Sequence, residues 1–173
     1  MLPLSHIGFT LTAVKILEKG MRLRQIDYRL VIAASLLPDL IDKSLLKALA
    51  GSVEYESRAI GHSLAFLTVI GILTLGRWFW KRETRLLPVF LGAFFHDFFD
   101  VMWLHPGIFF WPFYGWEFPK AINEAWLGKV QLGWYSIQQR DLLDNISVWI
   151  LLCFFMKIAL KRKIYDFLKK GIL

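Results

Sequence analysis

The stretch GAFFHDFFDVMWLHPG, residues 92–107, places four ionisable side chains inside an apolar run of the chain, and they are His96, Asp97, Asp100 and His105. Ionisable groups in hydrocarbon cost about 2.5–3.5 kcal/mol each on insertion scales, so a segment that keeps several of them is expected to use them. His96 and Asp100 are four residues apart and would share one face of a helix. An imidazole and a carboxylate placed in this way can bind one ion together.

The composition favours a membrane protein. The chain has 173 residues, enough for one domain, and 56% of them are hydrophobic, including eight Trp and fifteen Phe. Soluble domains average about 45–50% apolar residues. The net charge of +7 suits either nucleic acid or an anionic membrane surface. Because of the hydropathy we expect membrane lipid as the partner and no direct contact with nucleic acid.

The cysteine content and the first twenty residues bear on two further features, an internal disulfide and a secretory signal. The single cysteine, Cys153, excludes an internal disulfide. The first twenty residues lack the basic start and the small-residue cleavage site of a secretory signal, so we expect them to belong to the mature fold. We predict one membrane-embedded helical domain over residues 1–173.

Five apolar segments are too long for strands and show no strand-like alternation. They cover residues 4–17, 29–50, 59–76, 86–104 and 142–160. They predict an all-α integral-membrane bundle of about four to five apolar helices. A spanning helix needs about 20 mainly apolar residues, and the last three segments meet this requirement. The first two could be buried, partly inserted or half-spanning. Pro38 is expected to kink the second segment or to end its first half, whereas Pro88 would lie in the first turn of the fourth.

Residues 105–141 form the longest connection between the apolar segments. The aromatic part, HPGIFFWPFYGWEFP at 105–119, is typical of an interfacial cap or a re-entrant loop, because Trp and Tyr favour the headgroup level. It could be a plain aromatic belt, or a lid or lipid-contacting wall above a site. Residues 120–141 predict an amphipathic helix that lies along the membrane surface.

The basic residues set an orientation for the five segments. Residues 19–29, 77–85 and 157–170 hold fourteen of the twenty-one Lys and Arg. Short loops rich in Lys and Arg stay cytoplasmic. If all five segments cross, the N-terminus is outside, the C-terminus is cytoplasmic, and the connections at 51–58 and 105–141 face outward. We therefore expect a prokaryotic cytoplasmic (inner) membrane protein.

Six candidate metal ligands lie towards the outer face in this topology. The topology was assigned from the Lys and Arg distribution alone, so these residues played no part in it. They are His6, Asp39, Asp42, His62, His96 and Asp100. Helix bundles commonly build metal sites between facing helices. Nitrogen and oxygen ligands suit zinc, with manganese or iron as alternatives. The set contains no cysteine, which argues against a closed structural zinc site and favours a catalytic one with an open coordination position.

Each of these side chains also has a plainer interpretation when taken alone. His6 could be an ordinary terminal polar residue, and Asp39 could cap a helix that begins at Leu40. Asp42 could form an ion pair with Lys43 or Lys47, and His62 could form an interfacial pair with Ser63. His96 and Asp100 could form a buried hydrogen-bonded pair or a proton relay. Asp97 points about 100° away from His96 and could support the site or face Arg58. His105 precedes Pro106, where we expect a structural role.

The order of the motifs resembles the YdjM-like family. An N-terminal His is followed by LLPDLID, RAIGHSL, LGAFFHDFFD and WPF, over residues 4–119. The family is described as membrane-bound metal-dependent hydrolases and also as LexA-binding inner-membrane proteins. Its His-Arg-Gly-x-x-His-Ser element is matched by Arg58 and by His62-Ser63, whereas its His-Arg start reads Ser57-Arg58 here. Its Pro-Asp-x-Asp element appears with one extra residue between Asp39 and Asp42, and its His-x-x-x-Asp element is matched by His96 and Asp100.

The family is in turn distantly similar to zinc-dependent phospholipase C and the related single-strand nucleases. This similarity implies a ligand set of His6, Asp39 or Asp42, His62, His96 and Asp100. No His follows His105, so one or two metal ions are expected rather than three.

The expected function is a metal-dependent hydrolase that acts on a phosphoester, including a lipid headgroup bond, through a metal-activated water. Asp39 or Asp42 would act as the general base, and Arg58 would hold the substrate phosphate. One alternative is a non-enzymatic membrane protein whose polar cluster is a structural metal site, a buried network, or an ion or proton pathway. Another is a membrane adaptor whose basic face binds a soluble partner.

Overall fold

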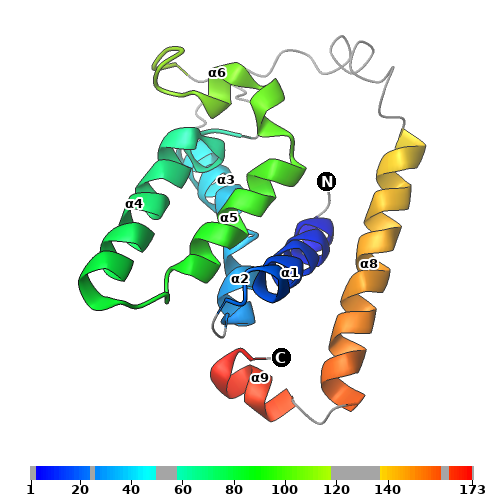
Figure 1. The fold of residues 1–173 in the computed structure, drawn as a ribbon. Coiled ribbons are helices and arrows are strands. Elements are labelled where there is room, and N and C mark those ends of the chain that lie inside the picture. The colour runs from blue at the N-terminus through cyan, green and yellow to red at the C-terminus, as the bar shows by residue number, and fades with distance from the viewer. Residues whose placement is uncertain (1–2, 24–25, 50–57, 118–136, 161–163, 173) are drawn as a thin grey trace.

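The computed structural model describes residues 3–23, 26–49, 58–117, 137–160 and 164–172, and every regular element in these ranges is a helix (Figure 1). Two helices are long and apolar enough to cross a membrane, over Leu64–Lys81 and Leu142–Leu160. The apolar helix at Leu87–Phe99 is shorter. The all-helical prediction is confirmed for the described residues, and two of the three predicted spans have the length to cross.

The first and last long helices pack against each other. α1 (Pro3–Gly20) lies beside α8 (Ile137–Leu160). A Cβ atom added at Gly8 would lie 2.9 Å from the carbonyl oxygen of Ser147, so the two backbones approach closely. Ser147 Oγ donates to Ser5 Oγ at 3.0 Å, and Ser5 Oγ donates to the Asp144 carboxylate. Small residues and interhelical hydrogen bonds of this kind hold helices together in lipid.

The second apolar segment is broken into two helices. α2 (Tyr28–Ala34) begins after Asp27, whose carboxylate accepts from Arg29 N at 3.0 Å. α3 (Leu37–Leu49) starts just before Pro38, which lies in its first turn, so the predicted interruption is confirmed. Helices of 7 and 13 residues are too short to cross a bilayer alone. Asp39 lies within the first turn of α3, so the helix-cap interpretation of this residue is wrong.

The third segment forms a short 3-10 helix and then a spanning helix. η1 (Ile60–His62) contacts α3, and α4 (Leu64–Lys81) follows it. Ser63 is the N-cap of α4 and accepts from Phe66 N at 3.1 Å. His62 therefore lies in an irregular turn just outside the spanning helix.

The fourth segment ends earlier as a helix than the sequence predicts. α5 (Leu87–Phe99) has Pro88 in its first turn, as expected, and ends at Asp100. The next residue, Val101, has φ 55° and turns the chain into η2 (Met102–Leu104) and α6 (Pro106–Phe109). The helix therefore has 13 residues, fewer than a full span.

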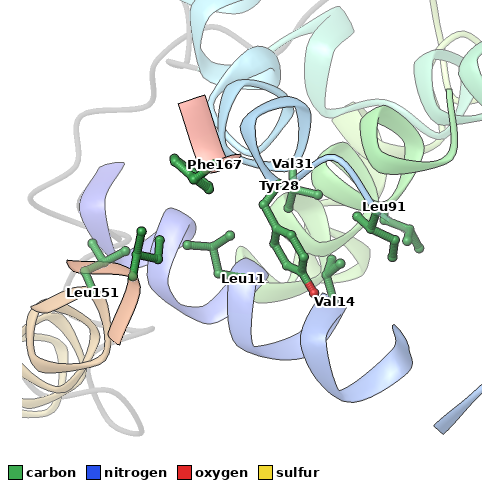
Figure 2. Packing of buried hydrophobic residues seen from close by; sticks show 9 residues of the cluster. Leu11, Val14, Tyr28, Val31, Leu91, Leu151 and Phe167 are labelled. Carbon is green, nitrogen blue, oxygen red and sulfur yellow. The ribbon is translucent and has the colours of Figure 1, made fainter. Parts of the chain in front are cut away.

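The hydrophobic core lies where α1, α2, α5 and α8 meet, and α9 (Ile164–Lys170) closes its far end. Figure 2 shows Leu11 and Val14 of α1 facing Tyr28 and Val31 of α2, with Leu91 of α5 beside them. The C-terminal end is tied to α2, because Tyr28 N donates to Gly171 O at 2.9 Å and Arg29 Nη1 donates to Leu168 O at 2.7 Å. Figure 1 places α9 at the end of the molecule opposite α6.

The predicted surface helix at 120–141 lies mainly outside the described residues. Its last residues belong to α8, which starts at Ile137 rather than at residue 142, so that boundary was wrong. The aromatic part at 105–117 is described and forms α6 and a turn with exposed aromatic side chains, including Phe113 and Trp116. The exposure of Tyr114 and Trp116 fits the interfacial position expected for Tyr and Trp at a membrane surface.

We expect Gly92→Ala to lower the stability of the protein, because α2 and α5 touch there. A Cβ at Gly92 would lie 2.6 Å from Ala34 Cβ and 2.9 Å from Val31 O, and the backbone oxygen cannot move aside cheaply. Overpacking of this kind costs about 1–3 kcal/mol. The matched control is Gly76→Ala in α4, where nothing lies within 4 Å of an added Cβ. Thermal unfolding in detergent checks this, and equal midpoints for the two variants would refute the close packing.

Candidate metal centre

Five side chains from four parts of the fold bring nitrogen and oxygen atoms together. They come from the start of α1, the first turn of α3, η1 and the end of α5, and they are His6, Asp39, His62, His96 and Asp100. Two groups of three have ligand atoms within 4.8 Å of one another: His6, His96 and Asp100, and Asp39, His62 and His96. His96 belongs to both groups. The three histidines are almost completely buried.

The distances around His62 and His96 define the centre. His62 Nε2 lies 3.1 Å from His96 Nε2. His62 Nε2 is also 3.6 Å from Asp39 Oδ1 and 3.8 Å from Asp100 Oδ2. His6 Nε2 lies 3.3 Å from Asp100 Oδ1, and its ring stacks on the ring of His96 with centroids 4.0 Å apart. These separations are close to those of ligands that surround one or two ions.

The other nitrogen of each central imidazole fixes its tautomer. His96 Nδ1 lies 2.6 Å from the carbonyl oxygen of Ser35, which can only accept, so we assign a proton to this nitrogen. His62 Nδ1 lies 2.6 Å from Asp42 Oδ2, and the same assignment follows for a carboxylate. Both Nε2 atoms then carry lone pairs that face each other at 3.1 Å. Two facing lone pairs repel unless a cation, either a proton or a metal ion, lies between them.

The donor set fits a divalent metal ion. Zinc–nitrogen bonds of about 2.0–2.1 Å place tetrahedral ligands about 3.3–3.4 Å apart. The separations from His62 Nε2, from 3.1 to 3.8 Å, bracket that value. Metal-bound histidines usually donate their second ring nitrogen to a carboxylate or a carbonyl, as His62 and His96 do here. The residues present therefore meet the chemical requirements of a metal site.

Asp42 is fully buried and holds η1 against α3. Its Oδ2 accepts from Ala59 N and from His62 Nδ1, both at 2.6 Å, and its Oδ1 accepts from Gly61 N at 2.6 Å. A Cβ at Gly61 would lie 2.5 Å from Pro38 O, so only glycine allows this approach. The ion pair expected between Asp42 and Lys43 is not what the structure has, because Lys43 pairs with Asp39; the side chain of Lys47, the other expected partner, lies outside the described part of the chain.

Asp39 points one oxygen at the histidines and the other at a lysine. Oδ1 lies 3.6 Å from His62 Nε2 and 3.9 Å from His96 Nε2, whereas Oδ2 accepts from Lys43 Nζ at 2.9 Å. Partial burial opposes the ionisation of Asp39, but the hydrogen bond and the positive charge of Lys43 act in the opposite direction, and the pKa of the carboxyl is lowered. Asp39 is therefore ionised at neutral pH, as a metal ligand must be.

Arg58 binds the carboxylate at the end of α5. Its Nε and Nη2 donate to Asp100 Oδ2 at 3.1 and 2.8 Å. Asp97 lies near enough to Arg58 to feel its charge, but no hydrogen bond joins them, and within the described ranges its two buried oxygens have no hydrogen-bond partner. His105 lies beyond the centre, at the start of α6, and belongs to neither group of ligand atoms.

The centre is closed on most sides and open on one. The side chains of His6, His62, His96 and Asp100 are at most 5% exposed, whereas those of Asp39 and Arg58 are 22% and 29% exposed. Solvent therefore reaches the centre at Asp39 and Arg58.

The carbonyl oxygen of Ser35 was not identified from the sequence as the acceptor for His96 Nδ1. The expected helix break near Pro38 was the available signal, because a helix end frees backbone carbonyl groups.

The fold and the centre define a class: an all-helical protein, with two helices able to cross a membrane and a buried His/Asp cluster able to hold a metal ion. The family model described as YdjM inner membrane protein matches residues 1–164. The chain therefore belongs to the YdjM inner membrane protein family, as the motif resemblance predicted. No curated protein and no solved structure matches the chain.

Proposed function

We propose that this protein is a membrane-bound hydrolase that uses a divalent metal ion to cleave a phosphoester bond. The observation that carries the proposal is the pair of His62 and His96 Nε2 atoms, which face each other at 3.1 Å with both Nδ1 atoms hydrogen-bonded to acceptors. Two carboxylates beside this pair supply the oxygen ligands. The resemblance to metal-dependent hydrolases supports the same conclusion.

The ligands in this proposal are His6, His62, His96, Asp39 and Asp100, with Asp42 as the residue that orients His62. Asp42 is preferred in that role because its oxygens already accept three hydrogen bonds. Zinc is the best match, with manganese or iron as alternatives. When bound, the ion supplies a Lewis acid that polarises a phosphoryl oxygen and makes water a better nucleophile at neutral pH.

Two side chains at the open edge take the remaining roles. Arg58 uses Nε and Nη2 on a single oxygen of Asp100, so its other N–H groups can donate to phosphate oxygens. The ionised Asp39 lies at the solvent-exposed edge and acts as the general base that takes a proton from water. The open edge supports a catalytic centre over a closed structural one.

The alternatives fit these features less well. An ion or proton pathway needs polar groups that continue across the membrane, but the described residues 64–76 of α4 and 145–156 of α8 contain no Asp, Glu, His, Lys or Arg. An adaptor role would not require the centre. We place the centre at the extracytoplasmic face and the C-terminus in the cytoplasm, because the basic residues near α9 and the α4–α5 turn lie at the end opposite α6 (Figure 1).

The test is hydrolysis of a soluble phosphodiester, bis(4-nitrophenyl) phosphate, by the detergent-purified protein. We expect activity that is lost on chelation and restored by added zinc or manganese. Asp39→Asn, assayed with saturating zinc, should lower kcat by about 10²–10⁴-fold, the range for loss of a general base. The control is Asp166→Asn in α9, which pairs only with Lys170 among the described salt bridges. A metal-loaded protein without activity, or with equal activity in Asp39→Asn, would contradict the proposal.

A further inference from the structure

The open edge of the centre carries apolar side chains beside its charged ones. We call Asp39, Leu40, Lys43, Arg58 and Leu64 the site rim. Asp39 and Lys43 share one face of α3 because they are four residues apart, and Leu40 lies three residues before Lys43. Leu40 is 63% exposed, although it follows a residue of the centre directly. An exposed leucine next to a residue of the centre can contact an apolar part of a substrate.

The exposed face of α4 starts at the same place. Leu64 is the first residue of α4, two positions after His62, and its side chain is exposed. Exposed apolar side chains then continue on the same side of the helix at Ile72, Leu75 and Phe79. α4 has the length and composition of a membrane-crossing helix, so hydrocarbon covers this face. An apolar path therefore leads from the bilayer to the edge of the centre.

Two cations stand at the end of this path. Lys43 Nζ lies 2.9 Å from Asp39 Oδ2, and its side chain is 60% exposed. Arg58 is 29% exposed and donates to Asp100 of the centre at 2.8 Å. Both can exchange part of their contacts with carboxylate for contacts with phosphate oxygens, because a phosphate offers the same kind of charged acceptor. The rim thus combines two positive groups at headgroup level with an apolar face below them.

We propose that the substrate of the centre is a membrane phospholipid, an inference that rests on the proposed function. Its phosphate lies between Arg58 and Lys43, and an acyl chain lies along α4 from Leu64 downwards. The lipid enters sideways from the leaflet at the site's end of the molecule. In the reaction, the oxygen of water bonds to phosphorus, a P–O bond of the phosphoester breaks, and the departing oxygen takes up a proton.

The test compares two substrates with the same preparation of full-length protein. The protein is reconstituted into vesicles of phosphatidylethanolamine and phosphatidylglycerol, and hydrolysis of these lipids is measured beside that of bis(4-nitrophenyl) phosphate. Leu64→Gln and Leu40→Gln should lower kcat/KM for the lipids about tenfold more than for the soluble ester, since apolar contacts in a binding pocket are worth roughly this much. The control is Leu168→Gln on α9, which is exposed at the opposite end.

A charge series tests the role of Lys43. Lys43→Gln should raise KM for the lipids, and Lys43→Arg should restore it, which a merely structural lysine would not require. Cleavage of the soluble ester without cleavage of lipid, or an equal loss for both substrates in the leucine variants, would overturn the lipid assignment and leave the hydrolase standing. If the metal-loaded protein cleaves neither substrate, both the proposed function and this inference fall.

Discussion

Replacing His96 with alanine is expected to abolish high-affinity metal binding. His96 is the one residue shared by both groups of candidate ligands, so its loss leaves each group with two donors. Loss of a supporting partner alone costs about 10–100-fold in metal affinity, and loss of a direct ligand should cost at least ~100-fold. Elemental analysis of the detergent-purified protein should find about one or two zinc, manganese or iron ions per wild-type chain. The variant should carry almost none.

The matched control for this experiment is His105→Ala. His105 is the other histidine near the end of α5, and it lies outside both ligand groups. Because His96 is buried and its ring stacks on His6, the alanine variant could lose stability, so His96→Gln should be measured beside it. The helical circular dichroism of each variant shows whether it has folded. A folded His96 variant with wild-type metal content would refute the centre, and a folded wild type without metal would favour a buried polar network.

Much of the centre could be predicted from local spacing and charge. His96 and Asp100 are four residues apart, and a helix brings them to one face. The clustering of His6 and His62 with them followed from the distribution of Lys and Arg, which assigned these residues to one end of the bundle. The choice between Asp39 and Asp42 could not be made in this way. It depends on the backbone at the start of η1, where Ala59 N and Gly61 N donate to the two oxygens of Asp42.

Two helix boundaries, the end of α5 and the start of α8, differ from the prediction for reasons that hydrophobic periodicity does not reveal. The fourth segment reads as continuously apolar, yet its helix ends at Asp100 because Val101 adopts a left-handed conformation with φ 55°. Valine rarely does so, and no sequence signal predicts it. The start of α8 at Ile137 was also missed, since its first residues are polar and resemble a surface helix. Such ends are decided by tertiary contacts rather than by local preference.

Asp42→Asn is expected to weaken the protein even without metal, whereas Asp39→Asn is not. An amide has only one acceptor oxygen, but Asp42 receives hydrogen bonds from Ala59 N, Gly61 N and His62 Nδ1 on its two oxygens. In either orientation the new NH₂ group faces a buried N–H donor. One unsatisfied buried donor costs about 1–3 kcal/mol. The orientation of His62 is lost as well, so metal affinity should fall about 10–100-fold.

Asp39→Asn is the matched comparison, because it makes the same chemical change three residues earlier on α3. In the proposed arrangement Asp39 offers a ligand oxygen at a half-open edge and supports no backbone group. The variant should bind metal weakly and unfold like the wild type once both are stripped of metal. Chemical unfolding of the chelated proteins, followed by metal titration, separates the two roles. Equal stability of chelated Asp42→Asn and wild type, with a loss only in Asp39→Asn, would reverse the assignment and make Asp42 the ligand.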